Sequence, residues 1–209
     1  MILRTIASTL LIATMAGAPA IAQDTQQTPA KDEETTTTPD LPLGEEIVDG
    51  VAVGTIYEKE KIGDWTLRCS RTADGKDPCH IYQLMQDDKG NSVAEINLFP
   101  LSGDEIRVAG ATIAVPLGTL LTEQLRLSVD GGATKRYQFT YCSVQGCYAR
   151  IGLTAEDIAG FKRGSAAILS IVPVAAPNAR VDVRLSLNGF TKAFETVTKI
   201  QQELAAEAQ

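Results

Sequence analysis

The sequence predicts an all-β fold, mainly antiparallel, built as a β-sandwich or an open barrel with two helices added to it. Apolar and polar residues alternate with a period of two in several segments, as they do in half-buried antiparallel strands. Turn-forming pairs such as Asp74-Gly75 and Lys89-Gly90 separate those segments. Helical periodicity is confined to a short insertion near 154–162 and a C-terminal stretch near 190–204.

The N-terminus has the three parts of a secretory signal peptide, which we assign to residues 1–22. Arg4 supplies a positive charge, an apolar run follows it, and Ala20-Ile21-Ala22 ends the segment with small residues. The apolar run is too short to span a bilayer. We therefore expect cleavage after Ala22 and a mature protein in the periplasm, at the cell surface or secreted.

Residues 23–60 differ in composition from the rest of the chain. They contain ten acidic and two basic residues, with many threonines and prolines, whereas residues 61–209 contain 16 acidic and 16 basic residues. Such a segment buries too little apolar surface to offset its ordering entropy, so we expect an acidic disordered spacer. Only 43–57, with more apolar residues and glycines, is ambiguous. The neutral remainder argues against nucleic-acid binding and against whole-domain attraction to anionic lipid.

Residues 61–204 are expected to form one β-domain, close to the commonest domain size. In the first strand Trp65, Leu67 and Cys69 point to one side, and the polar residues between them point to the other. The other expected strands span 79–86, 92–99, 112–115, 125–130, 136–142, 147–152, 166–172 and 181–188. In 136–142 the aromatic residues Tyr137, Phe139 and Tyr141 form one face.

Two helices interrupt the strand pattern. Thr154 is an N-cap candidate with Asp157 three residues on, a variant of the capping box, and the helix is expected to stop at Gly164. In the last segment an apolar stripe recurs every three or four residues, at Phe190, Phe194, Val197, Ile200 and Leu204. We expect this stripe to pack on its own sheet rather than on a membrane or a partner, and residues 205–209 to form a frayed tail.

The four cysteines are expected to form two local disulfides, Cys69–Cys79 and Cys142–Cys147, although four cysteines allow three pairings. Each pair flanks a predicted hairpin loop, and neighbouring strand residues there have Cα atoms about 4.5–5.5 Å apart, within the reach of a disulfide. A redox site would normally show C-x-x-C at a helix N-terminus. A zinc site would need closer spacing or histidines, and an oxidising compartment favours disulfides.

No motif for catalysis, a cofactor or a metal is recognisable. The single histidine, His80, lies in a predicted strand without a nucleophile motif beside it. No glycine-rich phosphate loop occurs. The carboxylate pairs Asp87-Asp88, Asp104-Glu105 and Glu156-Asp157 lie where turns and caps use acids. We therefore predict a protein that is not an enzyme, with a periplasmic enzyme or enzyme inhibitor using an unrecognised pocket as the alternative.

Several of these features together resemble the invasion-associated locus B family of exported bacterial proteins. The resemblance covers about 62–198 and rests on Gly63-Asp64-Trp65 before Cys69, on the two ordered cysteine pairs, and on Ser186-Leu187-Asn188-Gly189-Phe190-Thr191. It implies a compact, β-rich exported protein and carries over no catalytic residues. The resulting hypothesis is a non-enzymatic envelope protein that binds an unknown protein or envelope component, with a part in host-cell interaction left open. A structural envelope factor without one ligand is a further alternative.

Overall fold

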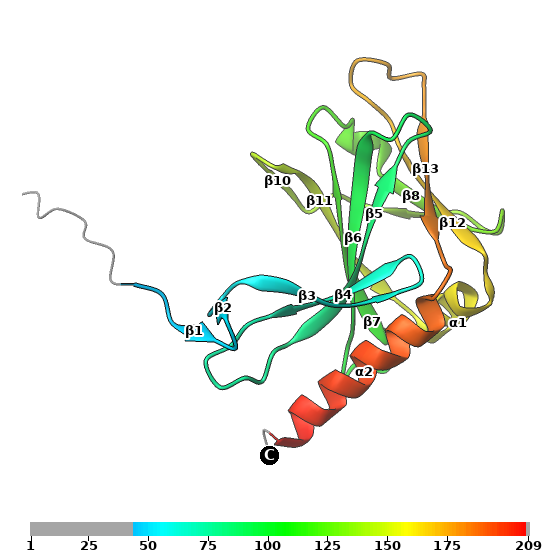
Figure 1. The fold of residues 1–209 in the computed structure, drawn as a ribbon. Helices are drawn as coiled ribbons and strands as arrows, with labels where there is room; N and C mark the ends of the chain where they lie inside the picture. The colour runs from blue at the N-terminus through cyan, green and yellow to red at the C-terminus, as the bar shows by residue number, and fades with distance from the viewer. Residues whose placement is uncertain (1–43, 208–209) are drawn as a thin grey trace, which may run out of the picture. The chain divides into compact units, whose positions relative to one another are not determined.

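Strands make up most of the secondary structure, and most of them lie where the sequence alternation predicts them (Figure 1). This computed structural model describes residues 44–207. The expected signal peptide, 1–22, and the expected spacer up to residue 43 lie outside the described residues. The prediction of mainly antiparallel β-structure with a short helix and a C-terminal helix is confirmed, and the sheets are open.

The larger sheet has seven antiparallel strands in the order β10-β11-β7-β6-β5-β4-β3. Neighbours in the chain pair as hairpins from β3 to β7, and β11 then pairs with β7. Its strands are β3 (Ile56–Ile62), β4 (Trp65–Ser70), β5 (Cys79–Gln86), β6 (Ser92–Pro100), β7 (Ala109–Val115), β10 (Tyr141–Ser143) and β11 (Gly146–Leu153).

The smaller sheet has four antiparallel strands in the order β13-β12-β8-β9. They are β8 (Leu125–Val129), β9 (Lys135–Tyr137), β12 (Ala166–Ile171) and β13 (Val181–Ser186). A separate hairpin of β1 (Ile47–Val48) and β2 (Val51–Ala52) precedes β3, and a 3-10 turn, η1 (Leu121–Glu123), precedes β8. The two large sheets approach each other where β13 contacts β5 and where β9 contacts β11.

The core lies between the two sheets and the helices. Trp65, Leu67 and Cys69 of β4 are buried, as the alternation predicts, together with the alternating apolar residues of β5, β6, β7 and β11. Trp65 packs edge-on against Phe190, with 5.4 Å between the ring centroids. A buried aromatic of this size removes much apolar surface from water, so Trp65 anchors the core and does not serve as a ligand platform.

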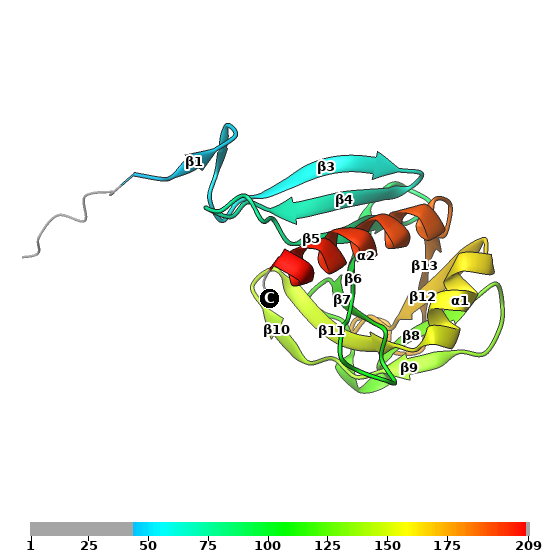
Figure 2. The same ribbon diagram turned by 90° about the horizontal axis from the view of Figure 1, so that it is seen from below.

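Helix α1 (Ala155–Arg163) begins and ends where the sequence predicts. Thr154 Oγ1 accepts a hydrogen bond from the Asp157 N–H, and Asp157 Oδ2 accepts one from the Thr154 N–H, which completes a capping box. Gly164 is the C-cap residue. Helix α2 (Phe190–Glu207) buries Phe190, Phe194 and other residues of its apolar stripe in the core. Seen from below, it lies between the β3–β4 hairpin and the side formed by β11 and α1 (Figure 2).

Three expectations about boundaries need correction. Strand β3 starts at Ile56 and pairs with β4, so the folded domain begins before residue 61 and the spacer ends before residue 60. Helix α2 continues to Glu207, into the segment expected to fray. The expected strand 136–142 is two strands, because β9 pairs with β8 whereas β10 pairs with β11 in the other sheet.

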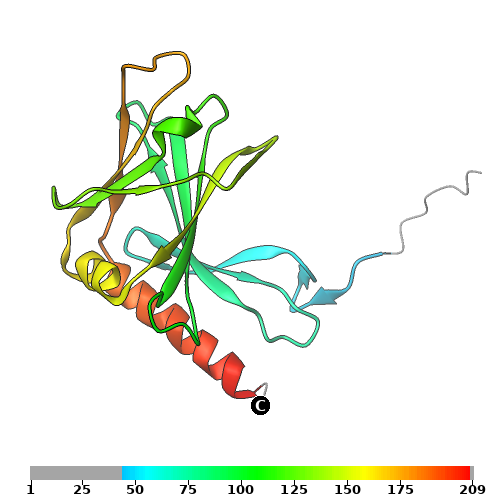
Figure 3. The same ribbon diagram turned by 180° about the vertical axis from the view of Figure 1, so that it is seen from behind.

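Neither helix of residues 44–207 combines the length and hydropathy that crossing a bilayer requires. Both helices lie at the same end of the long strands (Figure 3).

Candidate functional site

The cysteines form two local disulfides, Cys69–Cys79 between β4 and β5 and Cys142–Cys147 between β10 and β11. In each pair the two residues lie directly opposite each other in the sheet register. The Ser70 N–H donates to the Pro78 carbonyl beside the first pair, so Cys69 and Cys79 occupy the position where antiparallel side chains approach most closely. All four thiols are thereby taken up in cross-strand links, and none is left as a nucleophile.

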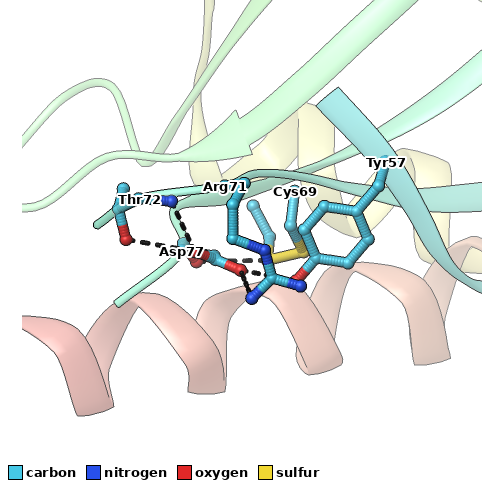
Figure 4. Close-up of a disulfide and its surroundings, with 6 residues drawn as sticks. Tyr57, Cys69, Arg71, Thr72 and Asp77 are labelled. Carbon is cyan, nitrogen blue, oxygen red and sulfur yellow. Dashed lines mark hydrogen bonds and ion pairs between the residues drawn. A yellow bond between two sulfur atoms is a disulfide. The ribbon is translucent and has the colours of Figure 1, made fainter. Parts of the chain in front are cut away.

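The loop closed by Cys69–Cys79 is held by a polar network around Asp77 (Figure 4). The Asp77 carboxylate accepts hydrogen bonds from Tyr57 Oη at 2.7 Å, from the Thr72 N–H at 2.8 Å and from Thr72 Oγ1 at 3.0 Å. Arg71 Nη1 lies 2.9 Å from the same carboxylate, and the guanidinium also lies over the Tyr57 ring. The network joins β3, the end of β4 and the loop before β5.

Electrostatics identify this network as structural. Burial alone would raise the pKa of Asp77, but the hydrogen bonds from Tyr57 and Thr72 and the charge of Arg71 more than offset it, so the pKa is lowered. Burial and the neighbouring Asp77 raise the pKa of Tyr57. A carboxylate held in its ionised form and a phenol held in its neutral form do not exchange protons at neutral pH. The arrangement therefore stabilises the loop and offers no acid–base pair.

His80 and the carboxylate pairs do not assemble into a reactive centre. His80 lies on β5 opposite Arg68, and its pKa is lowered by burial and further by the Arg68 charge. Asp87 and Asp104 accept backbone hydrogen bonds in their own turns, and Asp157 caps α1. Within residues 44–207 no three side chains of the metal-ligating types come together.

The glycines of the GDW and SLNG segments meet at one point of the fold. A Cβ on Gly63, whose φ is +63°, would lie 2.6 Å from the Asn188 carbonyl oxygen. A Cβ on Gly189, whose φ is +82°, would overlap the carbonyl oxygen of Ile62. The Asp64 N–H donates to the Asn188 carbonyl at 3.2 Å. Only glycine allows the two backbones to approach this closely, so both glycines are needed for packing.

Side chains from the larger sheet close the junction with β13. The Gln83 amide accepts a hydrogen bond from the Ser186 N–H at 2.7 Å and donates one to the Ser186 carbonyl at 3.0 Å. Trp65 Nε1 donates to the same carbonyl at 3.1 Å, and Ser186 Oγ donates to Asp64. Gln83 thus replaces the backbone partner that β13 lacks at this edge. The motif residues that carry the resemblance therefore build the fold and do not form a ligand site.

The other surface of the larger sheet is a continuous, solvent-facing band, which we call the outer face. Strand register carries it across the sheet, since Tyr82 lies opposite Asn97, Asn97 opposite Thr112, and Thr112 opposite Arg150. All its side chains are at least partly exposed. They include Glu58, Lys61, Thr66, Arg68, His80, Tyr82, Leu84, Glu95, Asn97, Phe99, Thr112, Ala114, Tyr141, Tyr148 and Arg150.

Tyr82 occupies the middle of the outer face. The Arg68 guanidinium lies over its ring, 3.4 Å from the centroid, and Arg68 Nη2 is 2.7 Å from Glu58 Oε1. Tyr82 Oη donates to Glu95 Oε2 at 3.2 Å. Burial raises the pKa of Tyr82, and the Glu95 charge raises it further, so the phenol stays protonated. Tyr82 is therefore held in place by Arg68 over its ring and by Glu95 at its hydroxyl.

A depression lies at each end of the outer face. One, of about 570 Å³, is lined by His80, Asn97, Phe99 and the Cys79 side of the disulfide, with the end of α2 at its margin. The other, of about 350 Å³, is lined by Leu84, Glu95, Gln145 and Tyr148, with Val93, Ala114 and Pro116. Volumes of this size suit small ligands or single units of a polymer.

A stacked tyrosine pair borders the second depression. Tyr141 and Tyr148 lie opposite each other on β10 and β11, with 4.8 Å between the ring centroids and 18° between the planes. Tyr141 remains 50% exposed. The Cys142–Cys147 disulfide fixes the hairpin that carries both rings, so the rings are held in place without a ligand.

Sequence reasoning placed none of these outer-face side chains in a site. The signal was present in the alternation, because the residues between Trp65, Leu67 and Cys69 must face away from the core. What the sequence does not contain is the order β11-β7-β6-β5, which brings Tyr148, Glu95 and Tyr82 onto one surface.

Comparison with known proteins assigns most of the domain to one family. Residues 65–198 match the family model described as invasion associated locus B (IalB) protein. Two Brucella abortus proteins, from strain 2308 and from biovar 1 strain 9-941, are each named invasion protein B homolog. Each is 24% identical to this chain over 139 residues, which are 66% of this chain and 78% of the relative.

A solved structure shares the fold. The crystal structure of invasion associated protein b from Bartonella henselae aligns with a TM-score of 0.60 and 24% sequence identity. The alignment covers 69% of this chain and 97% of that chain. At this identity the likeness establishes the common architecture alone.

Proposed function

This chain belongs to the invasion-associated locus B family, and on that basis we propose that it is an exported, non-enzymatic binding protein of the bacterial envelope. The observation that carries the proposal is the outer face, an uncovered sheet surface with aromatic and hydrogen-bonding side chains and a depression at each end. The family is not a known enzyme family. The ligand in this proposal is a protein or another envelope component.

Two features support the extracytoplasmic location. Two disulfides form in the structure, and such links persist in oxidising compartments and are rare in the cytosol. Residues 1–22 have the pattern of a signal peptide, which we propose is removed after Ala22. Residues 23–43, rich in acidic residues and threonines, would then form the N-terminus of the mature chain. Mass spectrometry of the mature chain tests the cleavage site.

Cross-linking in intact cells tests the binding function. A photo-reactive residue replaces Thr112, in the middle of the outer face, and a control replaces the exposed Asp182 on β13 of the other sheet. We expect an envelope component to be captured from position 112 and not from position 182. Recovery of the protein in the cytoplasm with reduced cysteines, or capture from neither position, would contradict the proposal.

The names of the relatives refer to invasion, and for this chain we propose a contribution to host-cell contact as a consequence of display at the cell surface. A deletion strain is complemented with the wild-type chain or with an outer-face variant, and host-cell association and envelope cross-linking are both measured. The comparison separates host-cell contact from envelope binding. Loss of host-cell association without loss of envelope cross-linking would assign the outer face to the host side.

A further inference from the structure

Aromatic residues gather on the outer face more than elsewhere on the surface. The sequence has five tyrosines, and three of them, Tyr82, Tyr141 and Tyr148, lie on this one sheet surface. Phe99 lies on the same surface, beside the first depression. By contrast, the chain's one tryptophan is fully buried in the core. Half-exposed rings on an uncovered sheet offer flat apolar platforms with polar tips.

Hydrogen-bonding groups stand beside these rings. Tyr148, Glu95 and Gln145 line the same 350 Å³ groove, and Pro116 and Leu84 contribute its apolar part. Ser143 Oγ lies 2.6 Å from Gln145 Oε1, which holds the amide on the hairpin. Asn97 and Thr112 continue the polar row toward the other depression. An apolar platform flanked by carboxylate, amide and hydroxyl groups matches a ring with C–H faces and hydroxyl edges.

The outer face mixes charges of both signs. Arg68, Arg150 and Lys61 are its cations, and Arg68 is paired with Glu58 at 2.7 Å. Glu95 supplies a carboxylate near the middle, and it accepts the Tyr82 hydroxyl. No concentration of one charge sign is available for a phosphate backbone or a strongly anionic polymer. Charge complementarity thus favours an uncharged ligand.

From this arrangement we infer that the outer face binds a neutral oligosaccharide of the bacterium's own envelope, with one sugar ring stacked in the groove on the side of Tyr148 that Tyr141 does not cover. The inference rests on the proposed envelope-binding function and names its ligand class. The groove has the volume of a small-ligand site, whereas a protein partner needs a broad surface of about 800 Å² on each side. From Leu84 to His80 strand β5 extends about 13 Å, so further sugar units of the same chain reach the first depression, beside His80 and Phe99.

Isothermal titration calorimetry of the mature chain, residues 23–209, tests the inference. The probes are neutral oligosaccharides released from the bacterium's envelope, acidic envelope oligosaccharides, and neutral host-cell glycans. We expect the neutral envelope fragments to bind. Tyr148→Phe should retain binding because the ring is kept, and Tyr148→Leu should weaken it roughly tenfold, the effect of losing one aromatic contact. Val144→Ala, at the 85% exposed hairpin tip, is the matched control and should bind normally.

Each other outcome overturns the inference. Equal binding by Tyr148→Leu and wild type would remove the groove as the site, and preference for host glycans would change the source. Absence of any oligosaccharide binding, with protein captured by cross-linking from position 112, would refute the sugar ligand and leave the proposed function standing. Intact disulfides in Tyr148→Leu, checked by thiol alkylation, show that a loss of binding is not a loss of the hairpin.

Discussion

Replacing Asp77 with asparagine tests whether the polar network beside the first disulfide stabilises the fold. The carboxylate accepts three hydrogen bonds of 2.7–3.0 Å and lies 2.9 Å from Arg71 Nη1. The two side chains are only 7% and 10% exposed. Asparagine has nearly the same shape, but it brings no charge to Arg71 and has one acceptor oxygen in place of two.

The expected loss is about 3 kcal/mol in the free energy of unfolding. Breaking a buried ion pair by removing one partner costs roughly 3–5 kcal/mol, because the remaining charge stays buried. The lower end applies because Arg71 retains Asp49 at 3.4 Å, although that carboxylate is 81% exposed. For a domain of this size the loss corresponds to a decrease in Tm of roughly 6–12 °C. Urea titration under non-reducing conditions measures it.

The pH dependence gives a second readout. Because the pKa of Asp77 is lowered in the folded state, its contribution is fully present above the ordinary aspartate value of about 3.9 and is lost as the pH falls through the lower, folded pKa. The difference between wild type and Asp77→Asn should be constant from pH 7 to about pH 5 and shrink below about pH 4. Asp74→Asn, at an exposed position in the same loop, is the control and should leave the urea midpoint nearly unchanged. A loss no larger than that of the control would refute the reasoning.

Three further changes test the contact between the two sheets near Gly63 and Gln83, and the two disulfides. Gly63→Ala should destabilise the protein by roughly 2–4 kcal/mol, because the new side chain would combine a positive φ with a backbone overlap. Gly160→Ala in α1 meets open space and should raise the free energy of unfolding by roughly 0.5–1 kcal/mol. Urea titration compares the two variants, and a change of the same sign in both would contradict the packing argument. Gln83→Met should cost roughly 1–3 kcal/mol by leaving the β13 backbone unpaired, measured in the same way; an unchanged midpoint would show that water replaces the amide. Cys142–Cys147 should be reduced before Cys69–Cys79, because Cys142 is exposed and Cys69 is fully buried; timed alkylation with mass spectrometry decides the order.

The local pattern was enough to predict most elements. Alternation marked β4 and β5, and the Thr154 cap fixed the start of α1, because both depend on nearby residues. The prediction of a single strand over 136–142 was wrong for a definite reason. Its period-two pattern continues through Tyr137, Phe139 and Tyr141, but the chain leaves one sheet and joins the other between β9 and β10. A pattern of faces does not identify the partner of a strand.

Long-range contacts account for what the sequence could not predict. Gln83 is an inward-facing polar residue in a strand, and its partner, the Ser186 backbone, lies 103 positions away. The outer face likewise depends on β11 pairing with β7, since that pairing brings Tyr148 next to the row that holds Glu95. Neither contact can be predicted from the residues that surround it in the sequence.

The residues that build the core and the proposed ligand-binding face therefore lie on opposite sides of the same strands. In β4 the inward residues Trp65 and Cys69 pack in the core, and Cys69 also forms the first disulfide, whereas Arg68 between them faces the proposed ligand. In β11 the buried Cys147 forms the second disulfide, and the next residue, Tyr148, points to the outer face. Because successive side chains point to opposite faces, substitutions on the outer face can change the ligand while the buried residues and the glycine junction preserve the fold. The buried residues and the glycines thus account for the architecture, and the proposed ligand choice falls to the outward positions.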